Sequence, residues 1–403
     1  MKSYIATYCS MRTQDQRTQD AVQFTNRLRS VRMKLGLSQG ELATRAGVTR
    51  QAVSAIESNL YLPTTAVALK LASVLACHVE DLFSLAPTED RIEGTLIGHL
   101  PYTETSTQPI RVKVSTVGKR TVVRPVTNLG EQLSFAVPAD GYVTAADRTL
   151  SGNTVRVTLS RDRDAIAQEI SVAGCDPAIF LVGEHLRRHR DRTSVVGWQM
   201  GSMAALQALL RGEVHVAGLH LFDPITGESN LPFLKRTVKE SSYDVVTFAT
   251  WEEGFLVRRG NPKSIRTAAD LAESMVTVVN REEGSGARLL LDQRLQSSGV
   301  VPTHVQGYDR IVSSHFEVAR TIAERHADVG IGIRSAAQHF DLDFVPLQAA
   351  RYDLVVPKSH LKSHPTLPHL FETLVSRPFR NEIAALGGYD TSETGKIHTV
   401  RAT

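Results

Sequence analysis

The spacing of apolar residues changes twice along the chain, and each change marks a different kind of structure. Between residues 22 and 86 the apolar positions recur every three or four residues, as in Ala52 and Ile56, which predicts short amphipathic helices. From 87 to 165 apolar and polar residues alternate in short β-branched segments. From 166 to 390 strand-like runs such as TSVVGW and DVGIGI alternate with helix-like ones, which indicates α/β architecture.

The middle segment is expected to be a small β-rich module that also links its neighbours. Pro87 ends the first domain, because its fixed φ and its missing N–H cannot continue a helix. The strands predicted after it are separated by Gly, Asn and Asp, and they indicate a small barrel or sandwich. In sequence order they are IRVKVSTV, TVVRPV, LSFAV, GYVTA and TVRVTLS.

The two ends of the chain are expected to lie outside these domains. Residues 1–21 are polar and have little to bury, so they predict a flexible arm. Residues 391–403 are expected to be a C-terminal tail. The chain is therefore predicted to be multidomain, with an all-α first domain, a β-rich middle and a larger α/β domain.

Local signals place two short helices around a tight turn in the first domain. Ser38 is an N-cap whose third helical position, Glu41, completes a capping box. Gly47 suits the turn, and Thr49 caps the next helix, TRQAVSAIES. The exposed start of that helix carries Arg50, Gln51 and Ser54, which are side chains that read base edges in a major groove. The alternative is a helical hairpin in a protein-binding bundle with a solvated polar face.

Net charge, hydropathy and cysteine content exclude some classes of protein but do not identify this one. The 403 residues carry a net charge of only +4, so any affinity for DNA must come from a local patch. No secretory signal opens the chain and no run of eighteen apolar residues follows, so a soluble cytoplasmic protein with no membrane partner is expected. Cys9, Cys77 and Cys175 are too few and too scattered for disulfides or a closed zinc site, and no metal is assigned.

Several helices of the α/β region are predicted to begin directly after a strand. Asp176, Ser202, Ser285 and Ser314 stand at these starts, where free N–H groups and the helix dipole favour an anion. If the starts converge, they make an oxyanion site. Taken singly, each is an ordinary helix cap. No Gly-Lys-Ser/Thr follows GSG at 284–286, so this is not a P-loop.

The run LGLSQGELATRAGVTRQAVSAIE resembles the Cro and phage-repressor family, also called the XRE family, over residues 24 to 86. The resemblance implies that Gln39 and Thr49 hold phosphates or the adjoining backbone. It also implies that Arg50, Gln51 and Ser54 enter the major groove of an operator, and that Arg32 pairs with Glu57. It also implies a homodimer on a palindromic operator. One departure is Asn59, which stands where a glycine is common and is expected to take the left-handed turn.

Residues from about 168 to 386 look like the type 2 periplasmic-binding-protein superfamily, specifically the cytoplasmic domain related to molybdate-binding proteins. The motifs are AGCDPA, GSMAAL, GLHLFDPITGESN, NREEGSGARLLLDQ and SHFEVARTIAERHADVGIGI. The resemblance implies two lobes joined by crossover strands near 245–257 and 344–356, with ligand between the lobes. On this mapping the ligand-binding residues are Asp176, Ser202, His220, Asp223, Asn230, Ser285, Arg288, Ser314 and His315.

Some of these assignments have structural alternatives. Arg288 would offset the charge of an oxyanion, or it faces solvent on a helix. His220 and Asp223 follow a strand, where hydrogen bonds that order the loop are a competing role. Cys175 is either a reactive thiol or a small buried side chain.

The leading functional prediction is a ligand-responsive transcriptional regulator with no catalytic residues and no covalently bound cofactor. Its partners would be double-stranded operator DNA and an oxyanion or other small molecule, with molybdate or tungstate as the candidate effector. Residues 138–159 faintly resemble a β-barrel module of molybdenum-insertion enzymes. The alternative is therefore a protein of molybdenum-cofactor synthesis or metal delivery. No nucleophile, base and orienting group form a recognisable set, which argues against an enzyme.

Overall fold

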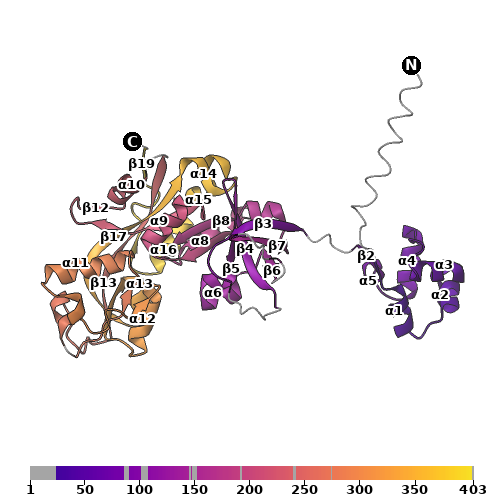
Figure 1. Ribbon diagram of the computed structural model, residues 1–403, viewed down its shortest axis with the longest axis horizontal. Helices are drawn as coiled ribbons and strands as arrows, with labels where there is room; N and C mark the ends of the chain where they lie inside the picture. The colour runs from indigo at the N-terminus through magenta and orange to yellow at the C-terminus, as the bar shows by residue number, and fades with distance from the viewer. Residues whose placement is uncertain are drawn as a thin grey trace, which may run out of the picture. The chain divides into compact units, whose positions relative to one another are not determined.

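The computed structural model divides the chain into two compact units, residues 1–90 and 91–403 (Figure 1). The predicted arm, 1–21, lies outside the described residues. No helix in the described part of the chain is long and apolar enough to cross a membrane. The described residues are 24–85, 90–100, 108–144, 147, 152–190, 193–238, 242–273 and 275–401.

The first unit packs short helices around one apolar core. Leu42, Val53, Ile56 and Leu71 are fully buried there because each helix turns its apolar face inward. Two short strands, absent from the all-α prediction, pair antiparallel and bring the ends of the unit together. The elements are β1 (Phe24–Asn26), α1 (Leu28–Lys34), α2 (Gln39–Ala46), α3 (Arg50–Glu57), α4 (Thr65–Val74), α5 (Val79–Leu82) and β2 (Phe83–Leu85).

The turn and cap signals of this unit are confirmed. Ser38 and Glu41 form the capping box of α2, and Thr49 accepts the N–H of Ala52 at the start of α3. Gly47 ends α2 with φ 63°, and Asn59 has φ 58°, so both take the left-handed turn expected of them.

The middle module is a closed barrel with strand order β3-β5-β4-β6-β7. The prediction of a strand at LSFAV is wrong, because these residues lie in and just after a helix. Leu133 and Val137 are four residues apart and pack on the same apolar cluster, which is helical rather than alternating spacing. The elements are β3 (Arg91–Leu96), β4 (Ile110–Val117), β5 (Arg120–Pro125), η1 (Val126–Leu129), α6 (Glu131–Ala136), β6 (Gly141–Val143), β7 (Thr154–Leu159) and α7 (Arg163–Ala167).

The larger part of the second unit has two lobes that share one mixed sheet of order β16-β13-β17-β10-β8-β9. Two long strands, β13 (Tyr243–Val257) and β17 (Asp343–Pro357), run antiparallel through both lobes and confirm the predicted crossovers. The first lobe contains β8 (Ile170–Gly174), α8 (Ile179–His189), β9 (Val195–Gln199), α9 (Ser202–Leu210), β10 (Val216–Leu219), β11 (Phe222–Asp223), β12 (Glu228–Ser229) and α10 (Leu231–Thr237).

The second lobe is inserted between the two crossover strands and has its own apolar core, which includes Leu290, Leu291 and Ile331. Its elements are η3 (Ala268–Ala272), β14 (Asn280–Arg281), α11 (Gly286–Ser297), η4 (Pro302–His304), β15 (Ile311–Val312), α12 (His315–Ala323), β16 (Val329–Ile333) and α13 (Arg334–His339). The chain then returns through α14 (Lys358–Ser363), α15 (Leu367–Leu374) and α16 (Arg377–Ala385).

The prediction of a C-terminal tail from residue 391 is wrong. After β18 (Tyr389–Asp390), strand β19 (Ile397–Val400) pairs antiparallel with Tyr243–Val246 of β13. The connecting turn is held by the hydroxyl of Thr394, which donates to the carbonyl of Phe248. The sheet therefore takes up backbone groups that a free tail would leave to water.

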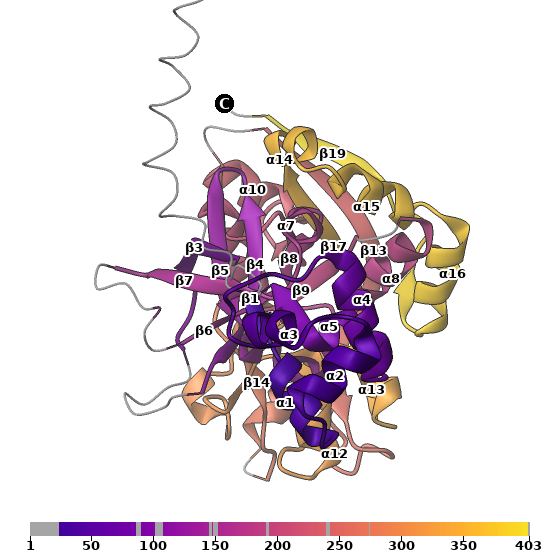
Figure 2. The ribbon, with the colours of Figure 1, turned by 90° about the vertical axis from the view of Figure 1, so that its right-hand side faces the viewer.

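The barrel is packed firmly on the first lobe, beside β8 and β9 (Figure 2). Val126 and Leu129 belong to the same apolar cluster as Trp198 of β9. A buried group of four charges crosses the same boundary: Lys113 Nζ lies 2.8 Å from both Asp140 and Glu169, and Arg161 lies within 2.9 Å of both carboxylates. The predicted division at 165/166 therefore does not separate independent bodies.

Candidate DNA-binding surface and interlobe site

The start of α3 presents the side chains expected to read DNA. Arg50 and Gln51 are exposed, and Ser54 is half-buried one turn later. The opposite side of the helix is anchored by Val53 and Ile56, neither of which is exposed to solvent. The helix is thus fixed by its apolar side, and its polar N-terminal side is free to enter a groove.

Gln39 is held by the fold rather than free. Its Nε2 donates to Glu57 Oε2 over 2.8 Å, and Glu57 also accepts two bonds from the guanidinium of Arg32, at 2.6 and 3.0 Å. The implied Arg32–Glu57 pair is confirmed. Burial would raise the pKa of Glu57, but the bonds from Arg32 and Gln39 outweigh it and lower the pKa. Glu57, the last residue of α3, therefore links the last turn of α1 to the first residue of α2 as an ionised carboxylate.

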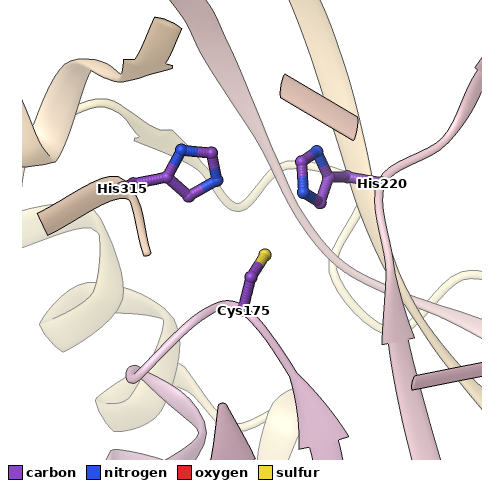
Figure 3. Close-up of side chains that lie close together, drawn as sticks. All are labelled: Cys175, His220 and His315. Carbon is purple, nitrogen blue, oxygen red and sulfur yellow. The ribbon is translucent and has the colours of Figure 1, made fainter. Parts of the chain in front are cut away.

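The interface between the lobes centres on three buried side chains from three separate elements (Figure 3). Cys175 directly follows β8, His220 directly follows β10, and His315 is the first residue of α12 in the second lobe. One donor atom from each, the sulfur and two imidazole nitrogens, lie within 4.8 Å of one another. Each residue is at most 2% exposed, so water does not surround the group.

The crossover strands form the wall behind these side chains. Trp251 of β13 and Tyr352 of β17 stack with ring centroids 4.8 Å apart, and the His220 ring lies edge-on to Trp251 at 5.5 Å. Gly174 and Gly218 are required beside this wall. A Cβ there would lie 2.2 and 1.8 Å from the Tyr352 hydroxyl, respectively.

Several polar atoms at this centre are buried without a hydrogen-bond partner among the described residues. They include both ring nitrogens of His315 and Nη1 of Arg281. The other nitrogens of Arg281 are bound by Glu282 and by the carbonyl of Ser313. His220 Nδ1 lies 2.9 Å from Glu253 Oε1 without hydrogen-bond alignment. Unsatisfied buried groups of this kind are expensive, so the centre is a candidate ligand site.

The two histidines differ in their electrostatic surroundings. Burial lowers the pKa of His220, but Cys175 and Glu253 outweigh it and raise the pKa to about 10. Burial, with Arg281 and His220 nearby, holds the pKa of His315 well below its usual value. Burial also raises the pKa of Asp176 to about 6. His315 is therefore a neutral imidazole at pH 7.

Two hollows flank this centre. One, of about 450 Å³, is lined by Asp176, Phe316 and Tyr389 among others, so it lies between the start of the first-lobe helix α8 and second-lobe helices. The other, of about 290 Å³, is lined by His220 and by Gly286 at the start of α11. Of the three buried residues, only His220 lines one of these hollows.

Two of the four predicted helix starts, those at Ser202 and Ser285, meet across the interface. The N–H of Met203 in α9 donates to the carbonyl of Gly284 just before α11, over 3.2 Å. Ser202 and Ser285 are fully buried at these starts: the Ser202 hydroxyl accepts the N–H of His220, and the Ser285 hydroxyl caps α11. The lobes are thus in direct contact here.

Four other predicted ligand residues are already engaged within the protein. Asp223 accepts from Arg236 and from two backbone N–H groups of its turn. Asn230 uses its amide to hold the chain around residues 219–221 and Asp353. Arg288 pairs with Asp292, and Ser314 caps α12. For Asp223, these bonds agree with the alternative that it orders its loop. For Asn230, Arg288 and Ser314, they supply a structural role.

Sequence reasoning missed the grouping of Cys175 with the two histidines, and it missed Arg281 and Glu253. The three donors have no ligand spacing in the sequence, because they come from separate strand ends and a helix start. The available signal was positional: Cys175 and His220 each directly follow a strand of one sheet, and such strand ends meet at one edge.

Comparisons with known proteins agree with this two-part organisation. Residues 28–82 match the helix-turn-helix family, and residues 183–374 match the PBP superfamily domain. The chain is 34% identical to the Bacillus subtilis protein YvgK over 228 residues, which cover 57% of this chain and 73% of that relative. It is 46% identical to an HTH-type transcriptional regulator of Methanothermobacter thermautotrophicus over 59 residues, which cover 14% of this chain and 86% of the relative.

Among solved structures, an ABC-type phosphate transport receptor from Vibrio cholerae is similar with a TM-score of 0.39 and 15% identity. The match covers 55% of this chain and 99% of that one.

Proposed function

Because this chain belongs to the XRE-type helix-turn-helix regulators and carries a PBP superfamily domain, we propose that a small ligand bound between its lobes controls its binding to operator DNA. The observation that carries the proposal is the group of buried polar atoms at the interlobe centre that have no hydrogen-bond partner in the described part of the chain. A ligand that satisfies these atoms binds one arrangement of the lobes better than another. That difference in affinity is what a switch requires.

An oxyanion such as molybdate or tungstate is the effector class to test first. Arg281 Nη1 is a buried cationic donor with no partner among the described residues, and the starts of α9 and α11 meet nearby across the interface. The proposal also includes a homodimer. Leu60, Tyr61 and Leu62, after α3, are 83%, 51% and 62% exposed, and a second copy could cover this apolar stretch.

One operator-binding experiment tests both halves of the proposal. The operator would be selected from random DNA with the full chain, and binding would be followed by fluorescence anisotropy with molybdate, tungstate, sulfate or phosphate. The Arg50→Ala/Gln51→Ala double variant should lose about 2–6 kcal/mol of binding free energy, since each bidentate base contact contributes about 1–3 kcal/mol. Its affinity for unrelated DNA should fall far less.

Arg188→Ala removes an equal charge from an exposed position on α8 and serves as the matched control. Unchanged operator selection by the double variant would exclude α3 as the reading element. A response of operator affinity to molybdate or tungstate, with little response to sulfate, would support the oxyanion effector. If operator affinity does not change with any of the four anions, oxyanions are excluded as the effector class. The proposal that the protein binds operator DNA would stand.

A further inference from the structure

We propose that Cys175, His220 and His315 form a binding site for a borderline-soft divalent transition-metal ion such as Zn²⁺, and that this ion joins the two lobes. The inference rests on the proposed function, because it names a ligand for the interlobe centre. Its first support is the donor set: one sulfur and two imidazole nitrogens are what Zn²⁺ and its neighbours in the first transition row prefer.

The geometry is close to that of a loaded site. Zn–N and Zn–S bonds of about 2.0–2.3 Å place tetrahedral donors about 3.5 Å apart. The three donor atoms here lie within 4.8 Å of one another, and a ring nitrogen of each histidine faces the sulfur in Figure 3. An inward movement of about 1 Å or less per side chain would complete the set.

The surroundings of the three residues combine one carboxylate, Glu253 beside His220, with one cation, Arg281 near His315. His315 has no hydrogen-bond partner for either ring nitrogen among the described residues, although it is only 1% exposed. Glu253 lies 2.9 Å from His220 Nδ1, and its other oxygen accepts from Gln348 over 3.1 Å. A carboxylate beside one imidazole nitrogen, with the other nitrogen left to ligate, is the usual outer-shell arrangement at zinc.

The donors are divided between the lobes, and this division gives the ion a mechanical effect. Cys175 and His220 belong to the first lobe, whereas His315 begins α12 of the second. An ion bound by all three therefore resists separation of the lobes about β13 and β17. Three protein ligands leave a fourth position open for water or an anion, so an oxyanion effector remains compatible with the metal.

The test uses the reduced, chelator-treated full chain and Co²⁺ as a spectroscopic probe. Wild type should take up one equivalent and develop the near-ultraviolet absorption of a cobalt–thiolate bond together with the visible bands of tetrahedral Co²⁺. Cys175→Ser, which is nearly isosteric, should lose the thiolate absorption. Cys77→Ser, in the first unit, should retain it. His315→Ala should weaken Zn²⁺ binding at least about 100-fold, more than the loss of an outer-shell partner.

Two further variants protect the test against misfolding. Glu253→Gln keeps the shape of the side chain and should weaken Zn²⁺ about 10–100-fold while leaving the cobalt–thiolate spectrum. His326→Ala removes an exposed histidine of the second lobe and should change nothing. Failure of wild type to bind one equivalent, or an identical cobalt spectrum in Cys175→Ser, would overturn the site.

The same samples separate this inference from the proposed function. Operator affinity would be measured with and without Zn²⁺. Metal uptake through Cys175 with unchanged operator affinity would support the site and count against control of DNA binding by this ligand. Operator affinity that responds to molybdate in a protein without metal uptake would overturn the site and leave the proposed function standing.

Discussion

The DNA-binding surface and the interlobe site are built in opposite ways. Arg50 and Gln51 are neighbours in the sequence, and both are exposed at the start of one helix. Cys175, His220 and His315 are distant in the sequence, and all three are buried between two lobes. A site on one helix depends on local spacing, so it can be inferred from sequence. A site between lobes depends on topology, which brings its parts together only in the folded chain.

The charges that stabilise the two units differ in number and in the parts that they join. In the first unit, Arg32 and Glu57 form one pair within the helical core. In the second, the four-charge group around Lys113 joins the barrel to the first lobe.

Trp198 and Trp251 are the only tryptophans of the chain, and both lie in the second unit. Tryptophan fluorescence therefore reports unfolding of that unit alone.

The largest expected difference between the units comes from Lys113→Met. Removal of this cation leaves the buried carboxylates of Asp140 and Glu169 with only Arg161 as a counter-charge, so the second unit should lose about 3–5 kcal/mol of stability. Urea unfolding followed by tryptophan fluorescence would measure it. Lys362→Met, at an exposed position of α14, is the control and should change stability little. Equal stability of the two variants would refute the importance of the network.

Acid should also weaken the second unit selectively. Burial, assisted by His364 and His360, lowers the pKa of His215 to about 3, while an unfolded histidine titrates near about 6.5. Below pH 6.5 His215 therefore binds a proton in the unfolded chain but not in the folded unit. The contribution of His215 to the free energy of unfolding is fully present above about pH 6.5. As the pH falls toward 3, this contribution decreases by about 1.4 kcal/mol per pH unit.

The measurement is the slope of unfolding free energy against pH between about 6 and 5. His215→Gln should reduce that slope by up to one proton, whereas His326→Gln, at an exposed position, should leave it unchanged. Because burial also lowers the pKa of His360 and His364, some acid sensitivity should remain in His215→Gln. A slope identical to wild type would contradict the role of His215.

The smallest expected effect belongs to the first unit. Ser38→Ala removes one half of the capping box of α2 and should lower the stability of this unit by about 1 kcal/mol. Far-ultraviolet circular dichroism of the isolated fragment 24–85 during urea unfolding would detect the change. In the full chain, the tryptophan transition should not move. Ser58→Ala, at the exposed end of α3, provides the comparison. A shift of the tryptophan transition in Ser38→Ala would show that the units do not unfold independently.

Sequence patterns identified the elements whose signals are local. The capping box at Ser38 and the crossover strands near 245–257 and 344–356 needed only spacing and β-branched runs, and the structure confirms them. Where side chains pack on a distant surface, the pattern misled: LSFAV contains a helical pair, Leu133 and Val137, that contacts the first lobe.

Strand β19 was missed for a related reason. Ile397 is 58% exposed and the strand has only four residues, so little hydrophobic patterning reveals it. Its pairing with β13 comes from backbone bonds that any sequence can make. The interlobe group was missed because no single segment contains more than one of its members.

The shared core of barrel and first lobe has a practical consequence for anyone building chimeras. Suppose that the sensor is to be fused to another DNA-binding domain. A cut at residue 165 would separate Val126, Leu129 and Leu133 from the first-lobe residues that they contact. It would expose an apolar surface prone to aggregation. A cut between Leu85 and Arg91 keeps that core whole. The transferable sensor is therefore the entire second unit. The barrel must be included because it shares an apolar core with the first lobe.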